Sequence, residues 1–200
     1  MTIYSLYIYD RHCNCVYYHD WHRSRRPKPA NEGGGFLPGV SRAVPRNTLS
    51  SGVLVAANET VPQSAPPLLQ THAINTPTTA SHTSSGLPFD EESKLVYGVI
   101  LSLRNMIKRL SGRDEQFVNY RTSTYKMHLY ETVTGYKLIM LSDPNADSLR
   151  FVLRSIHTGP FLEYVVRNPL VSMDSKERGI DNEYFRASVD RLVRGLSNFN

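Results

Sequence analysis

The stretch Ile3-Tyr4-Ser5-Leu6-Tyr7-Ile8-Tyr9 decides the fold, because it carries large apolar or aromatic side chains on both faces of a strand. Side chains alternate across a strand, which places Ile3, Tyr7 and Tyr9 on one face and Tyr4, Leu6 and Ile8 on the other. A strand that is apolar on both faces is typical of a sheet interior covered on both sides. Residues 15–21 follow a short polar turn and predict a second strand, so the chain is expected to open with a hairpin.

Length and composition limit the possible classes of protein. A chain of 200 residues fits one domain of ordinary size, or a smaller domain with an insertion. No apolar run is long enough to cross a membrane, and no secretory signal pattern precedes the first strand. Both cysteines lie in one C-x-C, Cys13 and Cys15, which is not a disulfide framework. These features predict a soluble protein of a reducing compartment such as the cytosol.

Residues 23–88 differ in composition from the rest of the chain. They hold nine of the twelve prolines, a single aromatic residue (Phe36) and the run Gly33-Gly34-Gly35. They also carry a net charge of +4, against +1 for the other 134 residues. So few large apolar side chains cannot offset an ordering entropy of roughly 1–2 kcal/mol per residue. We therefore expect a mostly disordered insertion within a single domain spanning 1–200, and a nearly neutral folded part.

The spacing of apolar residues predicts a helix from Asp90 to about Leu110. Asp90 is expected to cap this helix, since aspartate suits that position. Gly98 lies inside it at a cost of about 1 kcal/mol relative to alanine, so we expect a close backbone contact there. The expected core-facing stripe consists of Val96, Val99, Leu103, Met106 and Leu110, widened by Ile100 and Ile107.

The remaining chain predicts three strands and two helices. The strands are expected at 116–122, 125–132 and 136–142, with Thr134-Gly135 as a hairpin turn. One helix is expected to start near Asp147 and to be kinked or split at Gly159-Pro160. The last is expected from Asn182 to about Leu196. The order β-β-α-β-β-β-α-α predicts a mixed α/β (α+β) fold, a five-stranded, mainly antiparallel sheet between one helix and two helices.

A search for catalytic or metal-binding residues returns little. Cys13 and Cys15 have histidines nearby, but structural zinc takes ligand pairs spaced C-x(2–4)-C and no second pair follows. Nothing marks either thiol as an activated nucleophile. The glycine run 33–35 lacks the Lys-Ser/Thr of a phosphate loop. We therefore expect no catalytic residue, no metal site and no cofactor.

Several segments taken together carry a family resemblance. The opening hairpin and residues 18–23, 91–104, 120–132, 163–170 and 185–194 resemble the small longin-fold core subunits (subunit one, sedlin type) of the TRAPP vesicle-tethering complex. Nearly all residues outside the insertion are covered. The 23–88 insertion interrupts a connection that is a brief loop in shorter relatives, and such insertions are typical of fungal members. Gly159-Pro160 also departs from the family, in which that helix usually runs on.

The resemblance implies a longin-like fold and a non-catalytic subunit. The implied partners are a second longin-like subunit and Bet-three-type subunits, and, through the assembled complex, a Rab GTPase of ER-to-Golgi and Golgi traffic. The implied location is cytoplasmic, peripheral at Golgi and endoplasmic reticulum membranes. In longin-type pairs the first helix often contributes to a GTPase platform, which directs attention to Lys94, Arg104 and Lys108 as partner-binding residues. A solvated helix face is the alternative interpretation of these three cations.

Two other functions remain open. A sequence pI near 9.2 suggests a basic nucleic-acid-binding module, but the excess charge lies in the insertion and no aromatic–glycine RNA-binding signature is present. We therefore expect no nucleic-acid partner. A free-standing longin regulator of membrane fusion would be supported by a following coiled-coil helix, and none is seen before Asn200.

Overall fold

The computed structural model describes residues 1–22, 40, 87–111, 117–171 and 179–196. All of them belong to one compact unit made of Met1–Arg46 and Gly86–Asn200, whereas a second unit, Asn47–Ser85, lies outside the described residues. The expected insertion at 23–88 therefore falls almost entirely outside them, and its disorder stays a prediction. Val40, Leu87 and Pro88 are the described residues within it, and Val40 is buried in the hydrophobic core.

Five strands form one antiparallel sheet, as the sequence predicts. They are β1 (Ile3–Tyr9), β2 (Cys15–Asp20), β3 (Asn119–Arg121), β4 (Lys126–Glu131) and β5 (Lys137–Ser142). Their spatial order is β2-β1-β5-β4-β3, so β1 lies inside the sheet between β2 and β5. β3 is shorter than the expected 116–122, because only three residues pair with β4.

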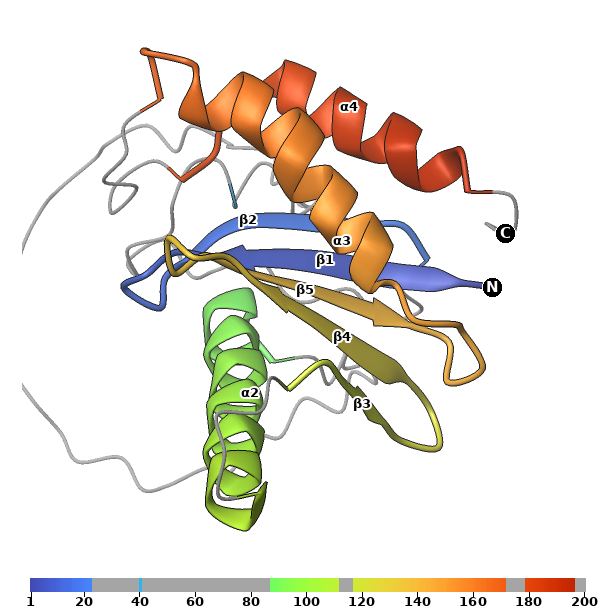
Figure 1. The fold of residues 1–200 in the computed structure, drawn as a ribbon. Helices are drawn as coiled ribbons and strands as arrows, with labels where there is room; N and C mark the ends of the chain where they lie inside the picture. Colours follow the sequence, from blue (N-terminus) through green and yellow to red (C-terminus); the bar gives the residue numbers. More distant parts are fainter. Residues whose placement is uncertain (23–39, 41–86, 112–116, 172–178, 197–200) are drawn as a thin grey trace, which may run out of the picture. The chain divides into compact units, whose positions relative to one another are not determined.

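Helices cover both faces of the sheet (Figure 1). α2 (Phe89–Ser111) lies against one face, while α3 (Arg150–Ile156), η1 (His157–Val166) and α4 (Glu183–Arg194) lie against the other. Because α3 and η1 are continuous, this is the predicted arrangement of one helix opposite two, and the mixed α/β class is confirmed.

Tyrosines of the first strand hold α2 to the sheet. The Tyr7 ring stacks on Phe89 at a centroid distance of 6.2 Å, and its hydroxyl donates to Glu92 Oε1 at 2.5 Å. The hydroxyl of Tyr9 donates to the Ser93 carbonyl oxygen at 2.7 Å. A buried phenol needs such an acceptor, so these bonds fix the first turns of α2 on β1.

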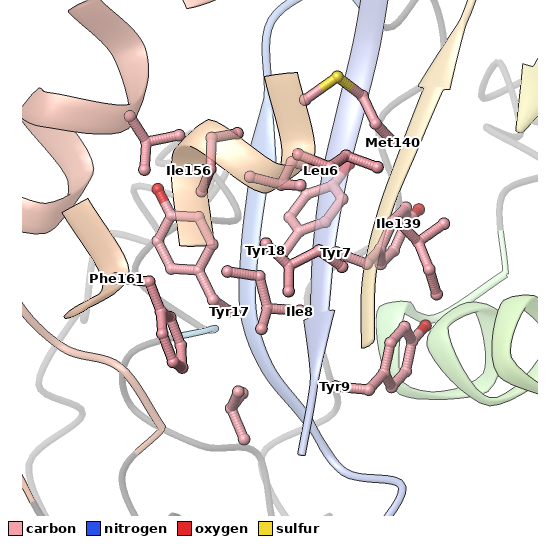
Figure 2. Close-up of a cluster of buried hydrophobic side chains, with 14 of the residues drawn as sticks. Leu6, Tyr7, Ile8, Tyr9, Tyr17, Tyr18, Ile139, Met140, Ile156 and Phe161 are labelled. Atoms are coloured by element: carbon pink, nitrogen blue, oxygen red, sulfur yellow. The ribbon is translucent and has the colours of Figure 1, made fainter. Parts of the chain in front are cut away.

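The opposite face of the hairpin packs on the C-terminal helices. Ile8 of β1 is paired with Tyr17 of β2, and Tyr17 packs edge-on against Phe185 of α4 at 4.9 Å. Phe161 of η1 contacts Phe185 in the same way at 6.3 Å. Figure 2 shows this aromatic and aliphatic cluster around β1. The apolar character of both faces of β1 therefore serves two separate layers of packing.

Two expectations about the first long helix are wrong. α2 begins at Phe89, so Asp90 lies in its first turn and is not the cap. The expected core stripe is also too wide: Ile100 is buried, but Val99, Met106 and Leu110 are exposed. A helix contacts a sheet over only part of its circumference, so an apolar pattern wider than that contact leaves one edge in solvent.

Gly159-Pro160 does not split the second helical segment. The chain runs from α3 directly into η1, a π-helix that contains Pro160. Hydrogen bonds from residue i to i−5, such as Arg167 N–H to the Leu162 carbonyl, widen the helix. Widening relieves the clash that a proline ring makes with the preceding turn of an α-helix. The predicted break therefore appears as a change of helix type.

Candidate interaction surface

The two cysteines occupy different environments. Cys13 is exposed at the β1–β2 turn, where its Sγ donates to the Tyr97 hydroxyl at 2.9 Å. Cys15 lies on β2, and burial raises the pKa of its thiol well above the ordinary value. A thiol with a raised pKa is a poor nucleophile and a poor metal ligand. Within the described residues, no three His, Cys, Asp or Glu side chains gather as metal ligands would.

A Tyr–His–Asp chain links β2 to α4. Tyr17 Oη lies 3.1 Å from His19 Nδ1, and His19 Nε2 lies 3.7 Å from Asp190 Oδ1. Burial raises the pKa of Tyr17, whose side chain is 0% exposed, and burial lowers the pKa of His19 to about 4. A fully buried, protonated phenol cannot reach a substrate. The contacts of Tyr17, His19 and Asp190 therefore hold β2 and α4 together.

The three cations that the resemblance selects lie on α2 in two different situations. Arg104 is half-buried, and its Nη1 lies 3.3 Å from Glu131 Oε1 at the end of β4. Lys94 and Lys108 are exposed. The structure therefore brings Arg104 into contact with the sheet and leaves the two lysine side chains at the surface.

Glu131 also attracts a lysine of the neighbouring strand. Lys137 Nζ lies 3.9 Å from Glu131 Oε1 and 5.6 Å from the centre of the Tyr97 ring. Arg104, Glu131, Lys137 and Tyr97 thus form one polar cluster where α2 meets the β4–β5 hairpin. Arg104 stabilises this contact in addition to any role toward a partner.

The most distinctive surface of α2 is apolar. This surface is formed by Leu95, Val99, Met106 and Leu110, whose side chains are 56%, 41%, 51% and 79% exposed. Spacings of four, seven and four residues place them on one line of an α-helix with 3.6 residues per turn. We name these four residues the α2 stripe. The sequence pattern contains it, but assigned three of its members to the core.

The α2 stripe and the exposed lysines lie on opposite flanks of the helix. With Ile100 directed at the sheet, a turn of about 100° per residue places Val99 about 100° away on one side. It places Lys94, Leu101 and Lys108 about 80–120° away on the other. Because Leu103 and Ile107 are half-buried and border the stripe, its apolar surface is continuous with the core.

Gly98 opens outward beside this stripe. A Cβ atom built on it would meet nothing within 4 Å among the described residues. The close backbone contact that we expected at this glycine is therefore not found in the described part of the chain.

None of the described helices is both long enough and apolar enough to cross a bilayer.

Residues 3–196 match the model of the Sybindin-like family. The chain belongs to the Sybindin-like family. This membership confirms the resemblance that the sequence segments carry.

Two of the relatives of this chain match it over its whole length, and a third matches a part of it. "Transport protein particle subunit bet5" of Schizosaccharomyces pombe is 36% identical over 202 residues, covering 100% of both chains. "Trafficking protein particle complex subunit 1" of Homo sapiens is 27% identical over 100% of this chain and 97% of its own. "Trafficking protein particle complex subunit 4" of Pongo abelii is 34% identical over 53 residues, which are 26% of this chain and 24% of that protein.

Proposed function

We propose that this chain is a non-catalytic core subunit of the TRAPP complex, supporting vesicle tethering in ER-to-Golgi and Golgi traffic. The observation that carries the proposal is the end-to-end match to a relative named as a transport protein particle subunit, at 36% identity over the whole of both chains. Coverage of the whole of both chains favours the same role in an assembly.

The proposed partners are a second longin-like subunit, Bet-three-type subunits and, through the assembled complex, a Rab GTPase. Nucleotide exchange needs no nucleophile or metal. An exchange factor binds the nucleotide-free GTPase more tightly than the loaded form, and this differential affinity speeds release of the nucleotide. A subunit of such an assembly contributes rigid surface, which the sheet and its helices supply.

The proposed location is cytoplasmic and peripheral at Golgi and endoplasmic reticulum membranes, with membrane association supplied by the complex. Fractionation of cells with and without the other subunits tests this. Membrane association that persists in cells lacking the other subunits would contradict it.

Lys94, Arg104 and Lys108 stay proposed partner-binding residues. Charge reversal of Lys94 and Lys108 is expected to slow exchange or weaken assembly without lowering the melting temperature. Reversal of Arg104 is expected to lower the melting temperature as well, because it places two acids together at Glu131, 3.3 Å away in the parent. Variants that assemble and exchange like the parent would show that these side chains make no contact with a partner.

Reconstitution tests the function as a whole. The purified chain alone is expected to leave the rate of nucleotide release from a Rab GTPase unchanged. The rate is expected to rise only when the chain completes a set of TRAPP subunits. Strong exchange by the single chain, or full exchange by the set lacking it, would contradict the proposal.

The same preparation tests the nucleic-acid alternative. Binding to random RNA is expected to be weak and to disappear with added salt, because non-specific binding comes from neutralised phosphates. It is also expected to depend on the basic segment 23–88. Salt-resistant RNA binding by the rest of the chain would favour the nucleic-acid function.

A further inference from the structure

We propose that Arg121 and Lys126 form a binding site for the phosphate group of an anionic lipid headgroup. Arg121 ends β3 and Lys126 begins β4, and the two residues are paired directly across the strands. The proposal goes beyond the proposed function and does not depend on it, because lipid binding is measured on the purified chain.

The strand pairing brings two positive charges together. Residues directly opposite each other in an antiparallel pair lie on the same face of the sheet, with Cβ atoms about 4.5–5.5 Å apart. Like charges in that position repel each other and destabilise the pair of strands. An anion held between the Arg121 and Lys126 side chains would remove this repulsion, so the pair is suited to bind one.

Both cationic groups reach the same loop, and both bind neutral oxygens there. Arg121 Nη2 donates to Asn145 Oδ1 at 3.2 Å, and Lys126 Nζ donates to the Ala146 carbonyl oxygen at 2.8 Å. Because Asn145 and Ala146 are consecutive, the two charged groups lie close together. The turn between β3 and β4 and the loop between β5 and α3 lie at the same end of the sheet (Figure 1).

Neither cation forms an ion pair within the described part of the chain. The ion pairs found there involve neither Arg121 nor Lys126. Asp143 and Asp147 belong to the same loop, but Asp143 Oδ1 accepts from the Asn145 N–H at 3.2 Å, and Asp147 is exposed. The charge of Arg121 and Lys126 is therefore open to an anion from outside the chain.

Helix α3 adds positive charge on the same face of the sheet. The Leu149 N–H donates to His128 Nδ1 at 3.3 Å, and His128 shares a face of β4 with Lys126 because side chains alternate along a strand. α3 therefore begins over the face that carries the two cations. Arg150 and Arg154 lie one turn apart on α3 and are both exposed, which widens the positive surface.

An exposed aromatic ring favours a lipid over a soluble phosphate compound. Phe151 is 78% exposed, and at about 100° per residue it lies about 60° from Arg154 around α3. Cations beside an exposed aromatic side chain are typical of surfaces that bind an anionic membrane. Each cation near such a membrane strengthens binding only about fivefold. The site alone therefore binds weakly, and lasting association still needs the complex.

The test is a titration of the purified full-length chain with vesicles at physiological salt. The vesicles are phosphatidylcholine with either a phosphoinositide or phosphatidylserine, matched in surface charge, and the dissociation constant is measured. Arg121→Glu changes the site. Arg11→Glu is the control, because it makes the same change of charge at an exposed turn. Arg11 lies beside Gly135, before β5 begins, whereas Lys126 pairs with Ser142 at the far end of β5.

The parent is expected to bind phosphoinositide vesicles at least about threefold more tightly than phosphatidylserine vesicles, because a phosphate group accepts strong hydrogen bonds from both cations. Arg121→Glu should raise the dissociation constant for phosphoinositide vesicles at least about tenfold, and Arg11→Glu less than about threefold. The melting temperature of Arg121→Glu should stay equal or rise, since opposite charges then face each other across the strands. No binding by the parent, equal binding of both vesicle types, or equal effects of the two variants would overturn the proposal.

Arg121→Gln separates a lost site from a lost fold. Glutamine keeps a donor for Asn145 but carries no charge, so vesicle binding should weaken at least about threefold while the melting temperature stays unchanged. Binding by Arg121→Gln that equals the parent's would also overturn the proposal.

A last pair of measurements distinguishes a lipid from a soluble phosphate compound. Phe151→Gln should weaken binding to phosphoinositide vesicles at least about threefold and leave the binding of a soluble inositol phosphate within about twofold, because only a membrane offers the ring an apolar surface. Vesicle binding that is unaffected by Phe151→Gln, with tight binding of the soluble compound, would assign the site to a soluble phosphate and overturn its assignment to a lipid.

Discussion

The indole N–H of Trp21 donates a hydrogen bond to Asp190 Oδ1 at 2.8 Å, which joins the end of β2 to α4 across 169 residues of sequence. Asp190 also accepts a bifurcated hydrogen bond from the single Nε–H of Arg194, at 2.9 Å to Oδ1 and 2.8 Å to Oδ2. Burial acts to raise the pKa of Asp190, but the bonds from Arg194 and Trp21 outweigh it and hold that pKa below its ordinary value. The carboxylate is therefore a charged anchor between the end of β2 and α4.

Replacing Trp21 with phenylalanine tests this anchor. Trp21→Phe removes the donor and keeps an aromatic ring, so we expect the free energy of unfolding to fall by about 1.5–3 kcal/mol, the usual worth of a hydrogen bond to a charged group. Urea denaturation followed by circular dichroism measures it. Arg191→Gln, on the exposed side of α4, is the control and should change stability by less than about 0.5 kcal/mol. An equally small effect of Trp21→Phe would contradict the anchoring role.

His128 makes stability depend on pH. The Leu149 N–H donates to His128 Nδ1 at 3.3 Å, which leaves the ring proton on Nε2 to donate to Ser142 Oγ at 2.9 Å. Burial, with a smaller contribution from Lys126, lowers the pKa of His128 from 6.5 to about 4. The unfolded chain therefore binds a proton in a pH range where the folded chain does not.

Stability from His128 is thus fully present above pH 6.5 and is lost as the pH falls toward 4. Between pH 7.5 and 5.5 the parent should lose about 1 kcal/mol through this residue, read from urea midpoints. His128→Gln cannot take up that proton and should show a flatter dependence, with some slope left from His19. An unchanged slope in His128→Gln would show that His128 is not responsible.

Gly135 is required by the turn between β4 and β5. Its φ of +88° is in the left-handed region, and a Cβ there would lie 3.2 Å from Arg11 Cβ. Gly135→Ala should lower the free energy of unfolding by at least about 1 kcal/mol, since the left-handed conformation alone costs this much. Gly98→Ala, in a helix with open space beside it, should instead stabilise the isolated chain. Melting temperatures of the pair measure the contrast, and similar shifts of the same sign would contradict it.

Shortening the insertion tests the predicted organisation of the chain. Replacing Asn47–Ser85, the second compact unit, with a short Gly-Ser linker should leave stability within about 0.6 kcal/mol, because loop length contributes only logarithmically. Val40 is kept, since it is buried in the core. Chemical denaturation and incorporation into the complex are the measurements. Insoluble protein or lost incorporation would show that this unit is structural.

The sequence predicts the strands well because alternation and turn chemistry are local signals. The hairpins around β1 and at Gly135 follow from them, as does the existence of α2. The sequence does not predict which side of α2 packs on the sheet. A buried side chain such as Ile100 and an exposed one such as Met106 belong to the same apolar pattern. The hydrogen bonds of His128 and the ion pair of Arg104 also join distant segments, and no local pattern encodes them.

Pairing of β1 with β5 has a consequence for how the chain folds during synthesis. Ile3 pairs with Ser142, so at about 5–20 residues per second the first strand is synthesised roughly 7 to 28 seconds before β5. Contacts so distant in sequence slow folding. During that interval the tyrosine-rich hairpin has neither β5 nor any helix to cover it. We therefore expect the first strands to be most exposed to aggregation in the nascent chain, before β5 and the helices cover them.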